Sequence, residues 1–480
     1  MKPGVGVSSE SSSIPTSRFP PVSVRSYSFL FLFGLVLRLG FLAWNWHTAP
    51  DWNIDALGYH HLAVNLLARR GFSLNTAPPF QPDGIRTPGY PLFLVLVYAL
   101  TNVTPRAVLI LQALLDAITA VVVADMTWRL ARARGVALLA GFLYALLPLA
   151  WRYAAELYVE SFLAFWLTFT FWLTLWVVQT TERRRMSGAL ALGVVTGFSL
   201  LVKPNVLLLP LFVAGILLAH RLFRHMLVFT AACMLVLTPW VARNVLVFGH
   251  PTLSLAFMNN LARVSAPATL AWAQHETIAP WTPRWEALFS QVVNVAAREY
   301  PALFATPEAD LSPRQVYQRQ AALADAAQAI IRAHPRAFLI SHLAGALRGW
   351  QPLEQRFWYA RLTGVGWEAT FPDGFIYHLM TKGWQQTPVL ASTLFFFFLT
   401  WRLIQLVGAG LGAIWLYPRD RAFVLALVLF IFYVTTLPGP IAYDRFHMPI
   451  MPLLHVFSAA GLVGLWRMAR SIRQRMSTAK

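Results

Sequence analysis

The sequence predicts an all-α protein that crosses a membrane many times, and three observations carry this prediction. Hydrophobic residues make up 57% of the 480 residues, and charged residues only 12%. Apolar runs long enough to cross a bilayer recur from one end of the chain to the other. The 19 Trp and 34 Phe residues are typical of interfacial belts and lipid-facing surfaces. We therefore expect a polytopic helical membrane protein.

The formal net charge of +19 first suggests nucleic acid as a partner, but the distribution of the charge argues against it. Basic residues gather in short loops between apolar segments, and Arg-rich short loops mark the cytosolic side of a membrane protein. We therefore interpret the charge as a topology signal and expect no nucleic-acid partner. The basic clusters are Arg129, Arg132 and Arg134; Arg183 to Arg185; Arg221 and Arg224; Arg419 and Arg421; and Arg467 to Lys480.

These basic loops predict about ten spanning helices, with both termini in the cytosol. The run from Pro91 to Val103 is apolar for only about a dozen residues, which is typical of an interfacial or re-entrant segment. A span there would put every later basic cluster on the wrong side, so we expect it to lie on the outer face or dip into it. The expected spans are 27–47, 106–128, 136–151, 158–180, 187–202, 204–220, 225–243, 388–416, 422–438 and 447–467.

The same pattern divides the chain into regions. Residues 1–26 are Ser- and Pro-rich and predict a disordered cytosolic tail ahead of an uncleaved signal anchor. Residues 27–243 form an N-terminal transmembrane module with an external loop at 48–105. Residues 244–386 form a small, mostly helical external domain, in which Pro313 begins a long helix. The C-terminal transmembrane helices occupy 387–468, and a basic cytosolic tail occupies 469–480.

Two features limit the chemistry. The sequence has no glycine-rich phosphate loop, so no nucleotide cofactor is expected. The single cysteine, Cys233, rules out an intramolecular disulfide. His60 and His61 are adjacent and point in different directions on a helix, so they do not by themselves predict a metal site.

The external loop at 48–105 carries the clearest functional signal. Its carboxylates, histidines and arginine include Asp55, His60 and Arg86, and they lie between strongly apolar segments. Ionisable residues held at a membrane surface indicate a functional site. A candidate general base beside a candidate anion clamp favours chemistry on a lipid that bears a phosphate.

The order of several short motifs resembles the C-type (GT-C) membrane glycosyltransferases over almost the whole chain. The most similar members are bacterial glycosyltransferase family 39 proteins, related to protein mannosyltransferases and the lipid A aminoarabinose transferase. Each motif is short, and the specificity lies in their order and spacing. The motifs are Asp55-x-x-x-Tyr59, the run RTPGYPLF from Arg86, Glu160-Ser-Phe-Leu, Leu-Val-Lys203-Pro204, Thr-Pro239-Trp-Val-Ala-Arg243-Asn244, and Arg445-Phe-His-Met-Pro449.

The resemblance implies a GT-C-like helical bundle and a specific reaction. Such enzymes move a sugar from a polyprenyl-phosphate donor to an acceptor at the outer, periplasmic face of the inner membrane, usually with inversion. The resemblance does not specify which sugar is transferred, and the acceptor could be a protein, a lipid or a glycan. Asp55 matches the family's loop acid and is the expected general base; its alternative role is a cap for the loop helix. Some family members have two adjacent acidic residues at this position, whereas this chain has only Asp55. Asp51 could replace the second acidic residue in orienting the substrate or binding a divalent metal.

The remaining site residues follow from the same motifs. Glu160 is the expected second catalytic carboxylate, and Glu156 is the other candidate for this role. Alternatively, Glu160 is only an acidic residue at a helix start, where the helix macrodipole favours a negative charge. Four cations at predicted outer helix ends or loops are expected to bind the donor phosphate, with snorkelling to lipid headgroups as the alternative. Arg402 is either an interfacial helix-start residue or the buried partner of a carboxylate. The four cations are Arg86, Lys203, Arg243 and Arg445, and the substrate-positioning residues are Tyr59, His60 and Tyr90.

Two other function classes remain open. An O-antigen ligase or polymerase would share the lipid-linked donor but is expected to show Arg-rich periplasmic loops rather than this early acidic loop. A transporter or flippase of lipid-linked sugars would also place charges in a helical bundle. It would usually show inverted repeats, and the sequence has no convincing internal repeat.

Overall fold

The chain folds almost entirely into helices. The computed structural model describes residues 22–46, 54–276, 278–351, 354–371 and 375–478. Within these ranges β-structure is limited to one isolated bridge between Ser73 and Pro82. The expected tail falls mostly outside the described residues, as does Asp51. The all-α class predicted from the sequence is confirmed.

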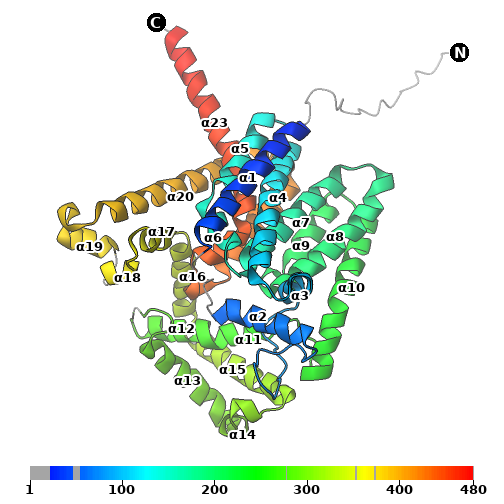
Figure 1. Cartoon of the computed structure of the whole chain (residues 1–480), viewed down its shortest axis with the longest axis vertical. Helices are drawn as coiled ribbons and strands as arrows, with labels where there is room; N and C mark the ends of the chain where they lie inside the picture. Colours follow the sequence, from blue (N-terminus) through cyan, green and yellow to red (C-terminus); the bar gives the residue numbers. More distant parts are fainter. Residues whose placement is uncertain (1–21, 47–53, 277, 352–353, 372–374, 479–480) are drawn as a thin grey trace, which may run out of the picture.

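The upper part of the molecule is a helical bundle (Figure 1). Seven described helices are long and apolar enough to cross a membrane, and the pair α5–α6, bent by 54°, makes an eighth if it is one span. The bundle contains α1 (Val24–Trp44), α4 (Pro105–Ala131), α5 (Arg134–Ala145), α6 (Pro148–Ala154), α7 (Val159–Gln179), α8 (Glu182–Val202), α10 (Phe223–Phe248), α20 (Val389–Leu416), α22 (Asp444–His447) and α23 (Met451–Thr478).

The two other predicted spans are also helical but shorter. They correspond to η2 (Pro204–Val206) with α9 (Leu209–Ala219), and to α21 (Arg421–Thr436). The apolar helix α3 (Gly89–Thr101) has 13 residues. At 1.5 Å per residue it is roughly 20 Å long, too short for a hydrocarbon core of roughly 30 Å. Figure 1 shows α3 nearly end-on, across the direction of the bundle helices, as expected for a helix that lies on a membrane face.

The close crossing of α20 and α23 fixes the C-terminal part of the bundle. A Cβ added to Gly412 would lie 1.8 Å from the carbonyl oxygen of Phe457, and one added to Gly461 would lie 2.0 Å from that of Gly408. Only glycine fits at such contacts, and small residues allow membrane helices to approach each other closely. The crossing therefore holds α23 in place together with the short helix α22 that precedes it.

A second layer of helices lies below the bundle in Figure 1. It contains α2 from the first loop and most of the helices between residues 256 and 333. The longest, α15, begins where Pro313 predicted, because Ser312 and Gln315 form a reciprocal capping box there. The helices are α2 (Ile54–Leu67), α11 (Ala256–Asn260), η3 (Leu261–Ser265), α12 (Ala266–Ala273), α13 (Pro283–Glu299), α14 (Pro301–Ala305), η4 (Glu308–Asp310) and α15 (Pro313–Ala333).

From this layer the chain returns to the bundle through a group of shorter helices. Figure 1 shows α16 beside the bundle, and α18 and α19 at the side, near the start of α20. The group consists of α16 (Pro335–Gly349), α17 (Glu354–Thr363), α18 (Trp367–Thr370), α19 (Phe375–Lys382) and η5 (Trp384–Gln386); η6 (Gly439–Ile441) and η7 (Met448–Ile450) lie before α23.

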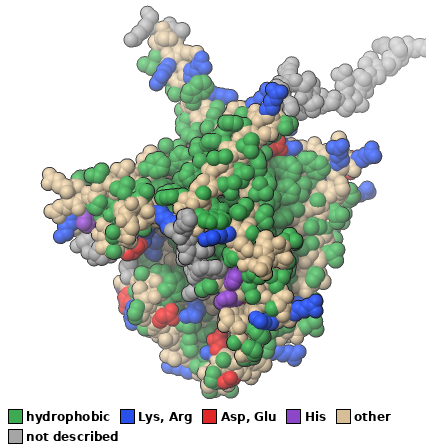
Figure 2. All heavy atoms as spheres, in the orientation of Figure 1, with side chains coloured by type: hydrophobic (Ala, Val, Ile, Leu, Met, Phe, Trp, Pro, Cys, Tyr) green, Lys and Arg blue, Asp and Glu red, His purple; other side chains and the backbone are tan. Residues whose placement is uncertain are grey.

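The surface changes character from the bundle to the lower layer (Figure 2). On the face shown, hydrophobic side chains cover most of the bundle, whereas the acidic side chains gather mainly in the lower layer. Lys and Arg side chains occupy the upper edge and the lower part, with a few between. An apolar belt between two charged zones is the surface expected of a membrane-spanning bundle.

Candidate functional site

Asp55 lies in the first turn of α2 and binds two arginines. Its Oδ1 accepts from Nη2 of Arg86 at 3.2 Å, and its Oδ2 lies 2.8 Å from Nη1 of Arg445. The side chain of Asp55 is 41% exposed, while those of Arg86 and Arg445 are 13% and 10% exposed. One accessible carboxylate is thus held by two largely buried arginine side chains.

Glu160 lies in the first turn of α7 and binds two cations through one oxygen. Its Oε1 accepts from Nζ of Lys203 and from Nε of Arg445, both at 2.8 Å. The side chain is fully buried, and among the described residues its Oε2 has no hydrogen-bond partner. Arg445 therefore joins Glu160 to Asp55.

These contacts bring five of the predicted site residues into one charged cluster, although they are far apart in the sequence. Asp55, Arg86, Glu160, Lys203 and Arg445 come from α2, the loop before α3, α7, the end of α8 and α22. Three cations face two carboxylates, which leaves one excess positive charge. Binding one singly charged anion would therefore make the cluster electrically neutral.

Each cation of the cluster also lies over an aromatic ring. The guanidinium of Arg445 is 4.2 Å from the ring centre of Tyr158, and that of Arg86 is 5.6 Å from the ring centre of Tyr59. Nζ of Lys203 is 5.5 Å from the ring centre of Phe446. The faces of such rings attract cations electrostatically. Tyr158 was not predicted, because a lone Tyr before a helix carries no recognisable signal.

The approach of Arg86 to α2 depends on Gly58. A Cβ at Gly58 would lie 2.6 Å from Nη2 of Arg86, so a larger residue would displace the guanidinium. The loop before Arg86 is fixed by Asp83, whose carboxylate accepts from the backbone N–H of Arg86 at 2.8 Å. The structure thus positions Arg86 from its backbone as well as its side chain.

Arg243 was predicted to bind the donor phosphate, but the structure does not bring it into the cluster. Its Nη1 donates to the carbonyl oxygen of Asp83 at 3.1 Å and to Oδ1 of Asn244 at 2.8 Å. Its guanidinium also lies within 5.7 Å of the ring centres of Phe72, Trp240 and Phe248. Arg243 therefore supports the loop that carries Arg86, because its Nη1 donates to the backbone of that loop and its guanidinium packs against three aromatic rings.

The three predicted substrate-positioning residues occupy different surroundings. Tyr59 is buried beneath Arg86, and its ring meets that of Tyr90 edge-on at 4.9 Å. Tyr90 is fully buried, and its hydroxyl donates to Oε1 of Gln112 at 2.5 Å. Tyr90 thus belongs to the packing of α3 against α4, and its role in positioning substrate stays a prediction.

His60 faces α3 rather than the charged cluster. Its Nδ1 lies 3.0 Å from the hydroxyl of Tyr98, and its ring is 5.9 Å from that of His61. Burial, and then the charge of His61, lower the pKa of His60 below its usual value. A neutral imidazole at physiological pH is the expected state.

Further buried charges lie beside the cluster. Arg402 pairs with Glu354 of α17, which decides between the two roles open for this arginine in favour of a buried partner. Arg152 binds Glu156 at 3.1 Å and lies 3.8 Å from Asp444. Glu156, the predicted competitor of Glu160, is thus bound to a different cation.

The charged partners decide the ionisation of Asp55. Burial opposes its charge, but the guanidiniums of Arg445 and Arg86, followed by Lys203, hold the pKa of Asp55 below its usual value. Asp55 is therefore an ionised carboxylate in this state. While both arginines are bound to it, its affinity for a proton is low.

The described residues contain no group of three or more His, Cys, Asp or Glu side chains arranged to hold a metal ion. The cluster pairs cations with carboxylates, and such an arrangement can bind an anion beside a proton acceptor.

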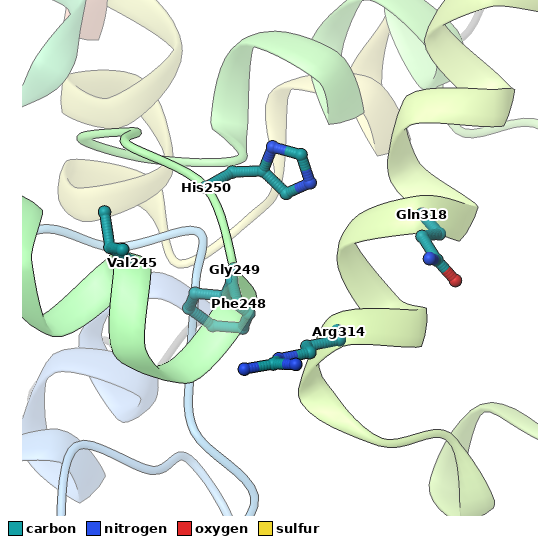
Figure 3. Close-up of a pocket in the computed structure, with 6 residues that line it drawn as sticks. All are labelled: Val245, Phe248, Gly249, His250, Arg314 and Gln318. Atoms are coloured by element: carbon teal, nitrogen blue, oxygen red, sulfur yellow. The ribbon is translucent and has the colours of Figure 1, made fainter.

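A surface cavity of about 370 Å³ lies elsewhere, between the end of α10 and the start of α15 (Figure 3). None of the predicted site residues lines it. Its wall includes Arg314, Gln318 and His250, and the ring of His250 stacks on Tyr317 at 3.9 Å. The cavity shares no lining residue with the charged cluster.

Two solved structures share a broad likeness with the chain. The oligosaccharyltransferase of Archaeoglobus fulgidus, in complex with Zn and sulfate, has 12% identity and a TM-score of 0.46; the match covers 92% of this chain and 49% of the other. The chain thus spans about half the length of that protein. ArnT of Cupriavidus metallidurans bound to undecaprenyl phosphate has 14% identity and a TM-score of 0.40, covering 92% and 77%. Nothing about activity follows from likenesses this low.

The family comparison is more specific. Residues 85–242 match the model of the dolichyl-phosphate-mannose-protein mannosyltransferase family. None of the curated proteins matches the chain. The matched segment begins next to Arg86 and includes Glu160 and Lys203 of the charged cluster. Over residues 85–242 the chain is therefore similar to the dolichyl-phosphate-mannose-protein mannosyltransferases, which confirms the resemblance to GT-C membrane glycosyltransferases expected from its motifs.

Proposed function

We propose that the chain is an integral-membrane glycosyltransferase that takes a sugar from a polyprenyl-phosphate donor at the outer face of the inner membrane. The observation that carries the proposal is the charged cluster, in which an accessible carboxylate lies beside three cations. A reaction of this class needs a base for the acceptor and cations for the departing phosphate. The family match over residues 85–242 supports the same class.

In this proposal the cations of the cluster receive the donor phosphate. A phosphodiester carries one negative charge, which balances the single excess positive charge of the cluster. Arg86 and Arg445 offer planar forks that suit a phosphate, and Lys203 adds a point charge. Arg243 is left out of the phosphate site because, in the described part of the chain, it makes no contact with the cluster's carboxylates and its Nη1 is bound to Asp83 and Asn244.

The two carboxylates take different roles because their exposure differs. Glu160 is fully buried and binds Lys203 and Arg445 through one oxygen, so we assign it to holding these cations. Asp55 is 41% exposed and can exchange its arginines for an incoming phosphate. When the phosphate occupies the guanidiniums, Asp55 loses the charges that lower its pKa and becomes a better proton acceptor.

The reaction then balances in one displacement step. Asp55 takes the proton of the acceptor hydroxyl, and the acceptor oxygen forms a bond to the anomeric carbon. The bond from that carbon to the phosphate oxygen breaks, and its electron pair leaves on the polyprenyl phosphate between the three cations. Attack from the face opposite the phosphate inverts the anomeric configuration.

The test is a transfer assay with the full chain in lipid nanodiscs. Polyprenyl-phosphate sugars with labelled sugar moieties are supplied together with a membrane extract as the source of acceptor. Transfer of label with release of the polyprenyl phosphate is expected. Asp55→Asn is nearly isosteric and should lower the rate at saturating donor by about 10²- to 10⁴-fold. Arg184→Ala, at an exposed position at the start of α8, is the control and should leave transfer unchanged.

Other outcomes would identify the alternatives. Movement of the lipid-linked sugar across a vesicle membrane without cleavage would indicate a transporter. Joining of long glycans from the same donor would indicate a ligase or polymerase. Near-normal transfer by Asp55→Asn would remove Asp55 from the role of base while leaving the function class intact.

A further inference from the structure

The guanidinium of Arg445 is held on its edges and on one face. Nε binds Glu160 and Nη1 binds Asp55, while the backbone N–H of Arg445 donates to Oδ1 of Asp444 at 2.9 Å. The ring centre of Tyr158 lies 4.2 Å from the guanidinium carbon, the shortest such distance in the described part of the chain. The face of the group is therefore supported by an aromatic ring.

Tyr158 is itself fixed in place. It is the residue before α7, its backbone N–H donates to the carbonyl oxygen of Glu156 at 2.8 Å, and its side chain is buried. Its ring also packs edge-on against Tyr153, with ring centres 5.8 Å apart. Because Glu160 follows two residues later, the start of α7 supplies both the ring and the buried carboxylate that contact Arg445.

The contacts with Tyr158 and Glu160 together can keep the guanidinium of Arg445 in the same orientation after its ion pair with Asp55 is broken. Without Asp55, the hydrogen bond from Nε to Glu160 and the contact with the Tyr443 side chain hold the edge of the guanidinium but leave its face unsupported. Contact with a ring face fixes the plane as well, because the negative face of the ring attracts the cation. A two-pronged contact to phosphate depends on that plane.

We propose that Tyr158 is a positioning residue for donor binding, which holds the guanidinium of Arg445 so that the edge released by Asp55 meets the donor phosphate. This inference rests on the proposed function, since it assumes that the anion in the cluster is a lipid phosphate. Tyr59 and Phe446 lie farther from their cations, at 5.6 and 5.5 Å, so the effect is concentrated at Tyr158.

The test separates the charge of the ring face from the volume of the ring. Tyr158→Phe and a series of increasingly fluorinated phenylalanines at position 158 keep nearly the same shape, but the ring face becomes steadily less negative. The dissociation constant of a polyprenyl phosphate is measured for each full-length variant in nanodiscs. Tyr158→Phe should stay within about 2-fold of wild type, and complete fluorination should weaken binding by roughly 2- to 30-fold.

A matched control is the same series at Phe171, a fully buried ring of α7 that packs against Phe423 and Phe430. Fluorination there should leave polyprenyl-phosphate binding unchanged. In the transfer assay the Tyr158 series should raise KM for the donor more than it lowers kcat. Tyr158→Leu, which removes the ring, should reproduce the weakest member of the series if its thermal unfolding resembles that of wild type.

A flat series at position 158, in a protein that binds polyprenyl phosphate normally, overturns the role of Tyr158 and leaves the proposed function standing. An equal loss of binding in the Phe171 series also overturns it, since packing alone would then explain the effect. Wild-type protein that neither binds polyprenyl phosphate nor transfers its sugar overturns both proposals.

Discussion

At the scale of single residues, Arg445 has the central place, because one guanidinium binds two carboxylates that differ in exposure. Glu160 is fully buried, whereas the side chain of Asp55 is 41% exposed. Removing one partner of a buried ion pair costs far more than removing one partner of an exposed pair. Glu160→Gln should therefore impair folding, and Asp55→Asn should mainly impair chemistry.

The pH dependence of transfer should report the exchange of Asp55 between partners. In the free enzyme Arg445 and Arg86 hold the pKa of Asp55 low, so the acidic limb of kcat/KM for the donor should lie below the usual range of an Asp. In the donor complex the phosphate occupies these cations, so the pKa of Asp55 rises and the acidic limb of kcat should lie at higher pH. Rates measured across the acidic range at low and saturating donor test this.

Coincident acidic limbs would argue that Asp55 keeps its arginines when donor binds. A limb that persists in Asp55→Asn would assign the titration to another group.

Substitutions of Arg86 should show how much phosphate binding depends on the planar guanidinium and how much on its positive charge alone. A charge-assisted contact is worth about 1.5–3 kcal/mol, so Arg86→Ala should weaken polyprenyl-phosphate binding by roughly 10- to 100-fold. Arg86→Lys should recover only part of this, because lysine cannot make the two-pronged contact. Equilibrium binding in nanodiscs measures both. Equal affinity of Arg86→Lys and wild type would contradict a two-pronged contact.

At the scale of elements, the site depends on how closely α2 approaches the loop before α3. Gly58 faces the guanidinium of Arg86, and the backbone of that loop is held by Asp83. Because α2 presents no side chain at Gly58, Arg86 can lie across it and still reach Asp55 in the preceding turn.

Gly58→Ala should separate binding from stability. Alanine favours a helix over glycine by about 1 kcal/mol, so α2 itself should not be weakened. The added Cβ would lie 2.6 Å from Arg86 and should displace its guanidinium, which we expect to raise KM for the donor by roughly tenfold, the loss of about one charge-assisted contact. Transfer kinetics and thermal unfolding measure the two effects.

Gly40→Ala is the control, because a Cβ at this position of α1 meets nothing within 4 Å. The two variants gain the same helix propensity and differ only in the contact with Arg86. An unchanged KM in Gly58→Ala would mean that Arg86 does not need its observed position for donor binding.

The helices were predictable because long apolar runs have few alternatives, and all ten expected spans correspond to helices. The charged cluster was predictable in part, since cations at predicted outer helix ends run against the distribution of basic loops. The sequence could not separate Arg243 from Lys203, because both follow the same rule and only three-dimensional packing gives one of them to Asp83. Tyr158 and Gly58 depend wholly on contacts between distant segments.

At the scale of the whole molecule, the distribution of basic loops fixes a topology that labelling can test. We expect residues near 75, 300 and 441 to be external, and residues near 132, 184, 222 and 420 to be cytosolic. Single cysteines at these positions, probed with a membrane-impermeant thiol reagent in intact cells, measure this. Cys233 is buried, so background labelling should be low.

Labelling of position 132 from outside would mean that α3 spans the membrane. It would also reverse the side assigned to every helix after α3, and the proposed outer-face site would then be wrong.

The residues of the charged cluster lie between positions 55 and 445 of the sequence. The ribosome synthesises the chain from its N-terminus to its C-terminus. During synthesis, Asp55, Arg86, Glu160 and Lys203 enter the membrane long before Arg445 leaves the ribosome. Until α22 arrives, neither carboxylate has its shared arginine. Under the proposed function, the chain should therefore be unable to act on donor lipid throughout its own insertion, and nascent or truncated chains should be inert even when most of their helices are in place.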